Sequence, residues 1–212
     1  MRVSRFTFNM FGVNTYILWD DISKDATIID PGMIDATDRN IIDEFIRKND
    51  LKLSHLINTH MHIDHSFGIS YIKEKYRLRL EANSDDQFLA QRLKEQATMF
   101  GIPISIDDLR IDGDLKDVDK LFVGNEELYV IHVPGHSPGG IVLYAPQSSF
   151  IISGDVLFNS SIGRTDLPGG NYSQLINAIN SKLMILPRDT VVYPGHGPET
   201  TIEQELHNNP YL

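Results

Sequence analysis

The stretch that decides the fold of this 212-residue chain is Thr59-His60-Met61-His62-Ile63-Asp64-His65. Neutral imidazole and carboxylate groups are ligands of borderline divalent metals such as zinc. His60 and His62 are two residues apart, so on an extended backbone their side chains point to the same side. A strand that ends here, turns and opens a helix therefore aims four ligands into one small volume.

Three more ligand-type residues follow predicted strands farther along the chain. They are His136 in Pro134-Gly135-His136-Ser137, Asp155 in Ser153-Gly154-Asp155, and His196 in Tyr193-Pro194-Gly195-His196-Gly197. Taken alone, the first stretch also fits a His-rich polar loop that binds no metal. Seven ligand-type residues at four strand-to-loop junctions favour a site for two metal ions.

The order of these residues resembles that of the metallo-β-lactamase superfamily, and within it the glyoxalase II-like branch. The chain has the pattern H-x-H-x-D-H, then a distant His, an Asp and a last His. Two further motifs support the resemblance, Asp30-Pro31-Gly32 and Gly163-Arg164-Thr165-Asp166. The resemblance extends from Asn14 to the C-terminus. It implies an α/β fold, the four-layer αβ/βα sandwich, with the metals at one edge between two facing sheets.

The resemblance also assigns the ligands. It implies a first metal on His60, His62 and His136, a second on Asp64, His65 and His196, and Asp155 bridging both. We expect two divalent ions, foremost zinc, with iron or manganese as alternatives because all three accept His and carboxylate ligands. A water or hydroxide shared by the metals would attack the substrate. Asp64 and Asp155 are the catalytic carboxylates of this scheme.

Two residues outside the ligand set have competing interpretations. Asp30 is either a simple turn former or, as the resemblance implies, a residue beneath the ligands that fixes histidine orientation. Arg164 either binds the carboxylate of an anionic thioester substrate or forms a salt bridge with Asp166 that only orders its loop.

The resemblance implies a hydrolase of thioesters similar to hydroxyacylglutathione hydrolase, in a compact form that lacks the C-terminal helical domain of full-length glyoxalase II enzymes. This leaves the thiol carrier open. The first alternative is an iron-dependent persulfide dioxygenase using His60, His136 and Asp155 as a 2-His-1-carboxylate set. The second is a non-catalytic metal-binding protein. The complete set of ligand types favours the hydrolase.

Composition narrows the class of protein. A hydrophobic content of 41% with 23% charged residues is ordinary for a globular chain, and we expect one domain over residues 1–212. The formal charge of −10 argues against nucleic acid as a partner. The absence of cysteine and of a signal peptide or long apolar run predicts a cytoplasmic protein that does not interact with membranes. The oligomeric state is left open.

Hydrophobic periodicity predicts a repeated order of strands and helices. The expected strands are residues 3–8, 14–19, 26–29, 53–58, 78–82, 121–123, 127–133, 140–145, 150–152 and 190–193. The expected helices are residues 35–49 capped by Asp35, 65–75, 84–96 capped by Ser84, a helix capped by Ser173, and 200–206. His55 and His132 lie within strands and are expected to be structural rather than ligands.

Overall fold

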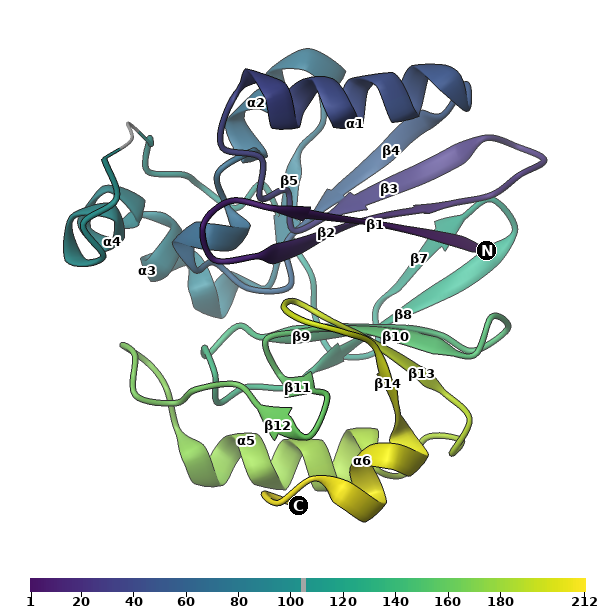
Figure 1. Cartoon of the computed structure of the whole chain (residues 1–212), viewed down its shortest axis with the longest axis vertical. Coiled ribbons are helices and arrows are strands. Elements are labelled where there is room, and N and C mark those ends of the chain that lie inside the picture. Colours follow the sequence, from purple (N-terminus) through teal and green to yellow (C-terminus); the bar gives the residue numbers. More distant parts are fainter. Residues whose placement is uncertain (104–105) are drawn as a thin grey trace.

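Two six-stranded sheets face each other in the computed structural model, which describes residues 1–103 and 106–212 (Figure 1). The first sheet has the order β1 (Arg2–Phe8), β2 (Val13–Trp19), β3 (Asp25–Ile29), β4 (Lys52–Ile57), β5 (Leu80–Ala82), β6 (Gly113–Asp114). The second has the order β14 (Thr200–Thr201), β13 (Val191–Pro194), β10 (Phe150–Gly154), β9 (Ile141–Ala145), β8 (Glu126–His132), β7 (Lys120–Val123). A small hairpin joins β11 (Leu157–Phe158) to β12 (Ser161–Ile162).

Helices cover the outer face of each sheet. In Figure 1, α1 (Ala36–Lys48) and α2 (Ile69–Tyr76) lie over the first sheet, while α5 (Tyr172–Ala178) and α6 (Ile202–Asn208) lie under the second. Short helices, α3 (Gln87–Ala90) and α4 (Leu93–Met99), lie at the edge. Single turns complete the set: η1 (Ile63–His65), η2 (Ser84–Asp86) and the π-type η3 (Ile179–Leu183). The predicted αβ/βα sandwich is confirmed.

Alternation along the central strands explains the four layers. Ile28 packs in the core between the first sheet and its helices, whereas its neighbour Ile29 packs in the core between the sheets. In β10, Ile152 faces the same middle core, and Ile151 packs toward α5. Because successive side chains on a strand point to opposite faces, a strand buried on both faces reads as a continuous apolar run.

Parallel pairing fixes where the functional loops gather. β3, β4 and β5 pair in parallel in the first sheet, and β10 pairs in parallel with β13 in the second. Parallel strands present their carboxyl ends at the same edge, which is where ligands bind in open α/β sheets. The stretch Thr59–His65 follows β4, Asp155 follows β10, and His196 follows β13, so all three reach this edge.

The predicted strands are present with shifts of one or two residues, and Asp35 caps α1 as expected by accepting from the backbone N–H groups of Thr37 and Asp38. Four short strands, β6, β11, β12 and β14, were not predicted.

Three helix predictions were wrong. The helix expected from His65 begins at Ile69, because side-chain hydrogen bonds of Asn58 and Gln96 hold the backbone of the preceding loop. The helix expected over residues 84–96 is split, and Asn83 caps its first turn instead of Ser84. Asn171, not Ser173, caps α5 by accepting from Gln174 N–H. Asn and Ser serve equally well at this position, so propensity alone does not choose between them.

Within the described ranges 1–103 and 106–212, no helix combines the length and the apolar character that crossing a membrane requires.

Candidate metal centre

The structure brings all seven predicted ligands to one edge between the sheets. Their ligand atoms form two compact sets in which every atom lies within 4.8 Å of the others. The first set comprises His60, His62 and His136, and the second comprises Asp64, His65 and His196. Each set takes residues from both halves of the sandwich.

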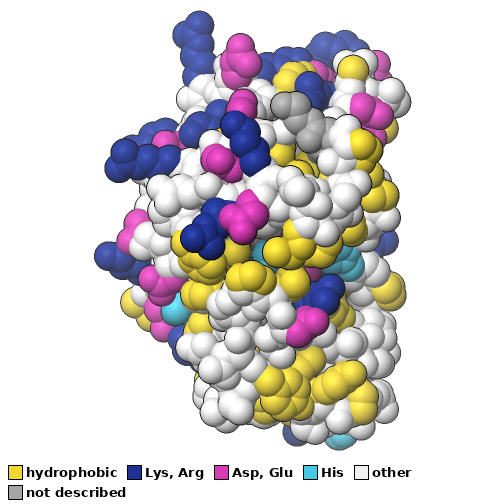
Figure 2. Space-filling view, turned by 90° about the vertical axis from the view of Figure 1, so that its left-hand side faces the viewer, with side chains coloured by type: hydrophobic (Ala, Val, Ile, Leu, Met, Phe, Trp, Pro, Cys, Tyr) yellow, Lys and Arg dark blue, Asp and Glu magenta, His cyan; other side chains and the backbone are white. Residues whose placement is uncertain are grey.

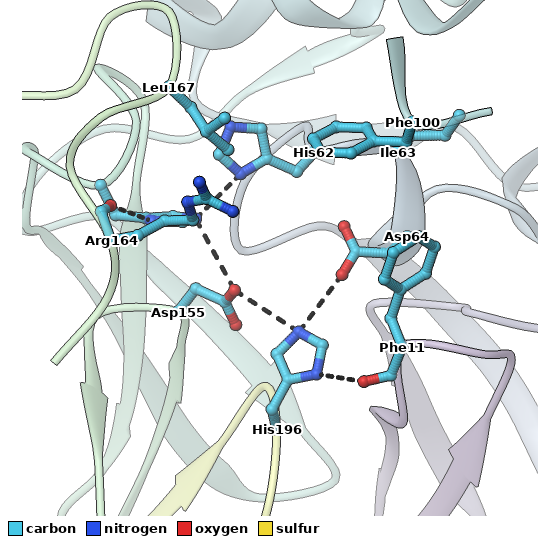
Figure 3. Close-up of a pocket in the computed structure, with 10 residues that line it drawn as sticks. Phe11, His62, Ile63, Asp64, Phe100, Asp155, Arg164, Leu167 and His196 are labelled. Atoms are coloured by element: carbon cyan, nitrogen blue, oxygen red, sulfur yellow. Dashed lines mark hydrogen bonds and ion pairs between the residues drawn. The ribbon is translucent and has the colours of Figure 1, made fainter. Parts of the chain in front are cut away.

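Asp155 lies between the two sets (Figure 3). Its Oδ2 is 3.7 Å from His136 Nε2 of the first set and 3.5 Å from His196 Nε2 of the second, and its Oδ1 is 3.4 Å from His65 Nε2. Gly195 makes room for this carboxylate, because a Cβ there would lie 2.2 Å from Asp155 Oδ1. A carboxylate in this place is suited to touch two metals.

Backbone carbonyls set the tautomers of two ligands. His136 Nδ1 lies 2.7 Å from the carbonyl oxygen of Arg164, and His196 Nδ1 lies 3.0 Å from that of Phe11. A carbonyl oxygen can only accept, so each Nδ1–H donates. The Nε2 atom of the neutral ring then carries the lone pair that a metal needs, and it faces the centre.

Asp30 fixes one ligand of each set. Its buried carboxylate accepts from Thr59 N–H and Thr59 Oγ1–H, both at 2.7 Å, and from His65 Nδ1–H at 3.1 Å. Because the Thr59 hydroxyl donates its hydrogen bond to Asp30, it accepts from His60 Nδ1–H at 3.1 Å. These contacts turn the Nε2 atoms of His60 and His65 inward. Through such contacts a buried carboxylate can fix the orientation of a histidine.

Burial and neighbouring charges shift the pKa values of His62 and His196 in opposite directions. Burial and the neighbouring His136 lower the pKa of His62 to about 3, so this ring is neutral. Burial alone would lower the pKa of His196, but Asp155 and Asp64 raise it to about 9. The negative potential of the two carboxylates thus stabilises a positive charge at the second set, as it would stabilise a bound cation.

Several ligand atoms are left without hydrogen-bond partners among the described residues. They are His60 Nε2, His62 Nε2 and Asp155 Oδ1, all buried. Burying an unpaired polar atom costs about 1–3 kcal/mol, a cost that coordination of a metal ion would remove. Together with the donor set of imidazoles and carboxylates, these atoms fit divalent metal ions.

Four side chains that sequence reasoning missed hold the metal-binding loop. Asp86 is fully buried and accepts from Met61 N–H, Ser137 Oγ–H and Gly139 N–H at 3.0, 2.8 and 2.6 Å. Asn58, Gln96 and Asn9 bind the backbone of His65, Ile63 and Asp64. Their only sequence signal is a polar residue next to the strand ends or within an otherwise apolar helix face.

Five of the seven predicted ligands, all except His60 and His65, line a cavity of about 200 Å³. The non-ligand lining consists of Phe11, Ile63, Phe100, Arg164 and Leu167. Arg164 uses its guanidinium on Asp166, with Nε–Oδ1 and Nη2–Oδ2 distances of 2.7 and 2.8 Å. His55 and His132 lie outside this cavity, as expected for structural histidines: His55 pairs with Glu81, and His132 contacts the Pro138 carbonyl.

The fold and the ligand geometry define an αβ/βα protein with a divalent-metal centre. A family model described as "Metallo-beta-lactamase superfamily" matches residues 9–196, and the chain belongs to that superfamily. It is 38% identical to hydroxyacylglutathione hydrolase GloC of Haemophilus influenzae, over 100% of this chain and 98% of the relative. The predicted resemblance, including its glyoxalase II-like character, is confirmed.

Solved structures share the fold over nearly the whole chain. BLEG-1, a B3 metallo-β-lactamase, aligns with a TM-score of 0.89 and 31% identity, covering 100% of this chain and 99% of its own. TTHA1623 in a di-iron-bound form aligns with a TM-score of 0.87 and 31% identity, covering 99% and 100%. ETHE1 from Myxococcus xanthus aligns with a TM-score of 0.78 and 26% identity, covering 99% and 84%.

Proposed function

We propose that the protein is a metal-dependent thioesterase similar to hydroxyacylglutathione hydrolase. The observation that carries the proposal is the pair of ligand sets, joined by Asp155, that open into one cavity. The identity of 38% to GloC along the full length supports a thioester as substrate. We propose zinc as the metal, with iron or manganese as alternatives.

The roles of the chain's own residues in this function are to hold the metal ions and to orient the histidine rings. Bound divalent metals would supply Lewis acidity and lower the pKa of water to roughly 7. The histidines of both sets, with Asp64 and Asp155, would hold the ions. Asp30 and the carbonyls of Phe11 and Arg164 keep the rings in the tautomers that present their lone pairs. This fixed geometry avoids reorganisation during the reaction.

The cavity lining favours a good leaving group. Besides the ligands it contains Phe11, Ile63, Phe100, Arg164 and Leu167, and none of these five carries a carboxyl, imidazole or thiol group to act as a general acid. A thiolate, whose conjugate acid has a pKa of about 8.5, departs without such an acid. An amide nitrogen needs a proton first. A thioester therefore suits this lining better than an amide.

We also propose that the substrate is an anionic small molecule. Arg164 is the one arginine or lysine in the described lining of the cavity and can bind a carboxylate through two parallel hydrogen bonds. A formal charge of −10 gives a nucleic acid no favourable surface.

A thioester panel assayed beside metal quantification tests the proposal. The metal-saturated protein should approach two ions per chain and hydrolyse thioesters. Asp155→Ala should lose both ions and the activity, because its carboxylate reaches both sets. The exposed Asp189→Ala is the matched control and should retain both. A stable maximum of one ion, or an Asp155→Ala variant with full metal content and turnover, would contradict the proposal.

A persulfide dioxygenase is the second candidate. His60, His136 and Asp155 can form a 2-His-1-carboxylate set with open positions. The similarity to ETHE1 is in line with this alternative. Oxygen uptake with a low-molecular-weight persulfide by the iron-loaded protein, without thioester turnover by the zinc-loaded protein, would favour the dioxygenase.

A further inference from the structure

We infer that Phe11 and Phe100 form an apolar subsite that binds a short aliphatic or aromatic group of the substrate. The inference rests on the proposed thioesterase function and adds the shape and polarity of the substrate to it. In Figure 3 both rings lie on the side of Asp64, across the pocket from Asp155 and Arg164. We call this pair of rings the aromatic wall.

The aromatic wall and the residues beside it leave apolar side chains exposed at the cavity. Phe11 and Phe100 each remain 39% exposed, and their rings meet edge to face with centroids 6.3 Å apart. Met10 and Met99, beside them in sequence, are 62% and 58% exposed. Figure 2 shows hydrophobic side chains on both sides of the exposed histidine atoms. An apolar patch that lines a cavity is typical of a binding surface.

Backbone hydrogen bonds connect Phe11 and Phe100 to the segments that hold the predicted ligands. The Phe11 carbonyl accepts from His196 Nδ1–H, and the Phe11 N–H donates to Asn9, whose amide also binds the backbone of Asp64. Phe100 follows α4, where its N–H donates to the carbonyl of Gln96 at 3.0 Å. These contacts fix the backbone positions from which the two rings extend toward the cavity.

The Gln96 side chain completes the connection on the Phe100 side. Its amide oxygen accepts from Ile63 N–H, and its amide nitrogen donates to the Met61 carbonyl, both within the metal-binding loop. A rigid apolar surface binds an apolar group without a large ordering cost. The aromatic wall is therefore arranged for a ligand at the metal centre rather than for general surface packing.

The cavity volume limits the size of that group. About 200 Å³ is less than the roughly 300–1,000 Å³ of pockets that enclose drug-sized ligands. The Arg164 guanidinium lies on the opposite side of the pocket (Figure 3). The substrate that fits both walls is a thioester with a short apolar group near Phe11 and Phe100 and a negative charge near Arg164.

Two series of anionic thioesters test the inference on the metal-loaded protein. One series lengthens the acyl group from acetyl to hexanoyl and phenylacetyl on a fixed thiol, and the other lengthens the thiol on a fixed acetyl group. We expect kcat/KM to rise about two- to fourfold per methylene in one series, which identifies the part that contacts the wall. Phe100→Ala should flatten that series, and Phe11→Ala should do the same.

The matched control is Phe122→Ala on β7, where the phenyl ring is 51% exposed and outside the cavity lining. This variant should keep the wild-type dependence on chain length. All variants should keep the wild-type metal content and melting temperature. If Phe100→Ala alters metal content, the milder Phe100→Leu, which keeps an apolar side chain but removes the ring, should reduce the preference for phenylacetyl over hexanoyl.

Binding measured without turnover separates this inference from the proposed function. Calorimetry with non-hydrolysable anionic S-alkyl thioethers should give a Kd that falls with alkyl length in the wild type and much less in Phe100→Ala. That result, with no thioester hydrolysed, would overturn the thioesterase and keep the subsite. Hydrolysis and binding that are indifferent to chain length, or equal length dependence in wild type and both Phe→Ala variants, would overturn the subsite.

Discussion

Arg164 and Asp166 form an exposed ion pair at the mouth of the pocket, with side chains 56% and 68% accessible. The hydrogen bonds from Arg164 lower the pKa of Asp166 to about 2, so the pair stays ionised at neutral pH. In this arrangement the guanidinium fork is engaged within its own loop. A substrate carboxylate would have to share or replace Asp166, so the two interpretations of Arg164 make different predictions.

If Arg164 binds the substrate, Arg164→Ala should raise KM for an anionic thioester by about three- to tenfold, the range of a partly solvated charge contact, and leave a neutral analogue unaffected. Asp166→Asn should lower KM for the same anionic substrate, because it frees the guanidinium. Steady-state kinetics with both substrates measure this. If both variants raise KM equally for anionic and neutral thioesters, the ion pair only orders the loop.

At the scale of elements, Asp86 joins two metal-binding loops from different sheets. From η2, its side chain accepts from the N–H of Met61, which lies between His60 and His62. It also accepts from Ser137 Oγ–H and Gly139 N–H, which follow His136. Burial raises the pKa of Asp86, while the three donors favour its charged form. The carboxylate thus positions three ligands of the first set without touching the centre itself.

We predict that Asp86→Asn lowers metal affinity about 10- to 100-fold, as loss of a contact that orients ligands does. An amide nitrogen would face N–H donors and leave at least one of them unpaired, at a cost of about 1–3 kcal/mol. Competition with a chelator measures the affinity. Its exposed neighbour is the control, since Asp85→Asn should bind metal as the wild type does. Equal affinities for the two variants would show that Asp86 has no positioning role.

The same region shows what the sequence could and could not predict. Ligand types and their places after strands predicted which residues would meet, because parallel strands end at a common edge. Strand periodicity predicted β1 to β4 within one or two residues. The helix expected from His65 failed because Asn58 and Gln96 hold the backbone of that loop through contacts 7 and 33 residues away in sequence. Local propensity carries no signal for such contacts.

At the scale of the whole molecule, His55 makes stability depend on pH. It lies on β4, where Nδ1 is 2.9 Å from Glu81 Oε1 on β5. The hydrogen bond to Glu81 raises the pKa of His55 against the effect of burial, with help from the charges of Glu81 and Asp25. A raised pKa means that the pair stabilises the fold fully below the unfolded-state pKa of about 6.5 and loses this contribution as pH rises through the folded-state pKa.

We therefore expect His55→Gln to destabilise the protein more at about pH 5.5 than at about pH 9. Urea unfolding of wild type and variant at both pH values gives the difference in the free energy of unfolding. His207→Gln on the exposed face of α6 is the control and should show no comparable change with pH. A larger effect of His55→Gln at the higher pH would contradict the sign of this prediction.

Metal binding should also stabilise the whole molecule, because each ligand set joins residues from both sheets. A ligand at about 1,000 times its Kd that binds only the folded state adds about 4 kcal/mol. For a chain of this size that corresponds to a rise in Tm of roughly 8–16 °C. Chelation should lower Tm by this amount.

The apolar core between the sheets contains no ligand, so the far-ultraviolet circular dichroism of the chelated protein should stay that of a folded chain. In Asp155→Ala the alanine side chain is too short to reach either ligand set. This variant should therefore show little change in Tm on chelation or on adding metal. A chelated wild type that is unfolded, or a Tm indifferent to metal, would show that the centre and the fold are not coupled in this way.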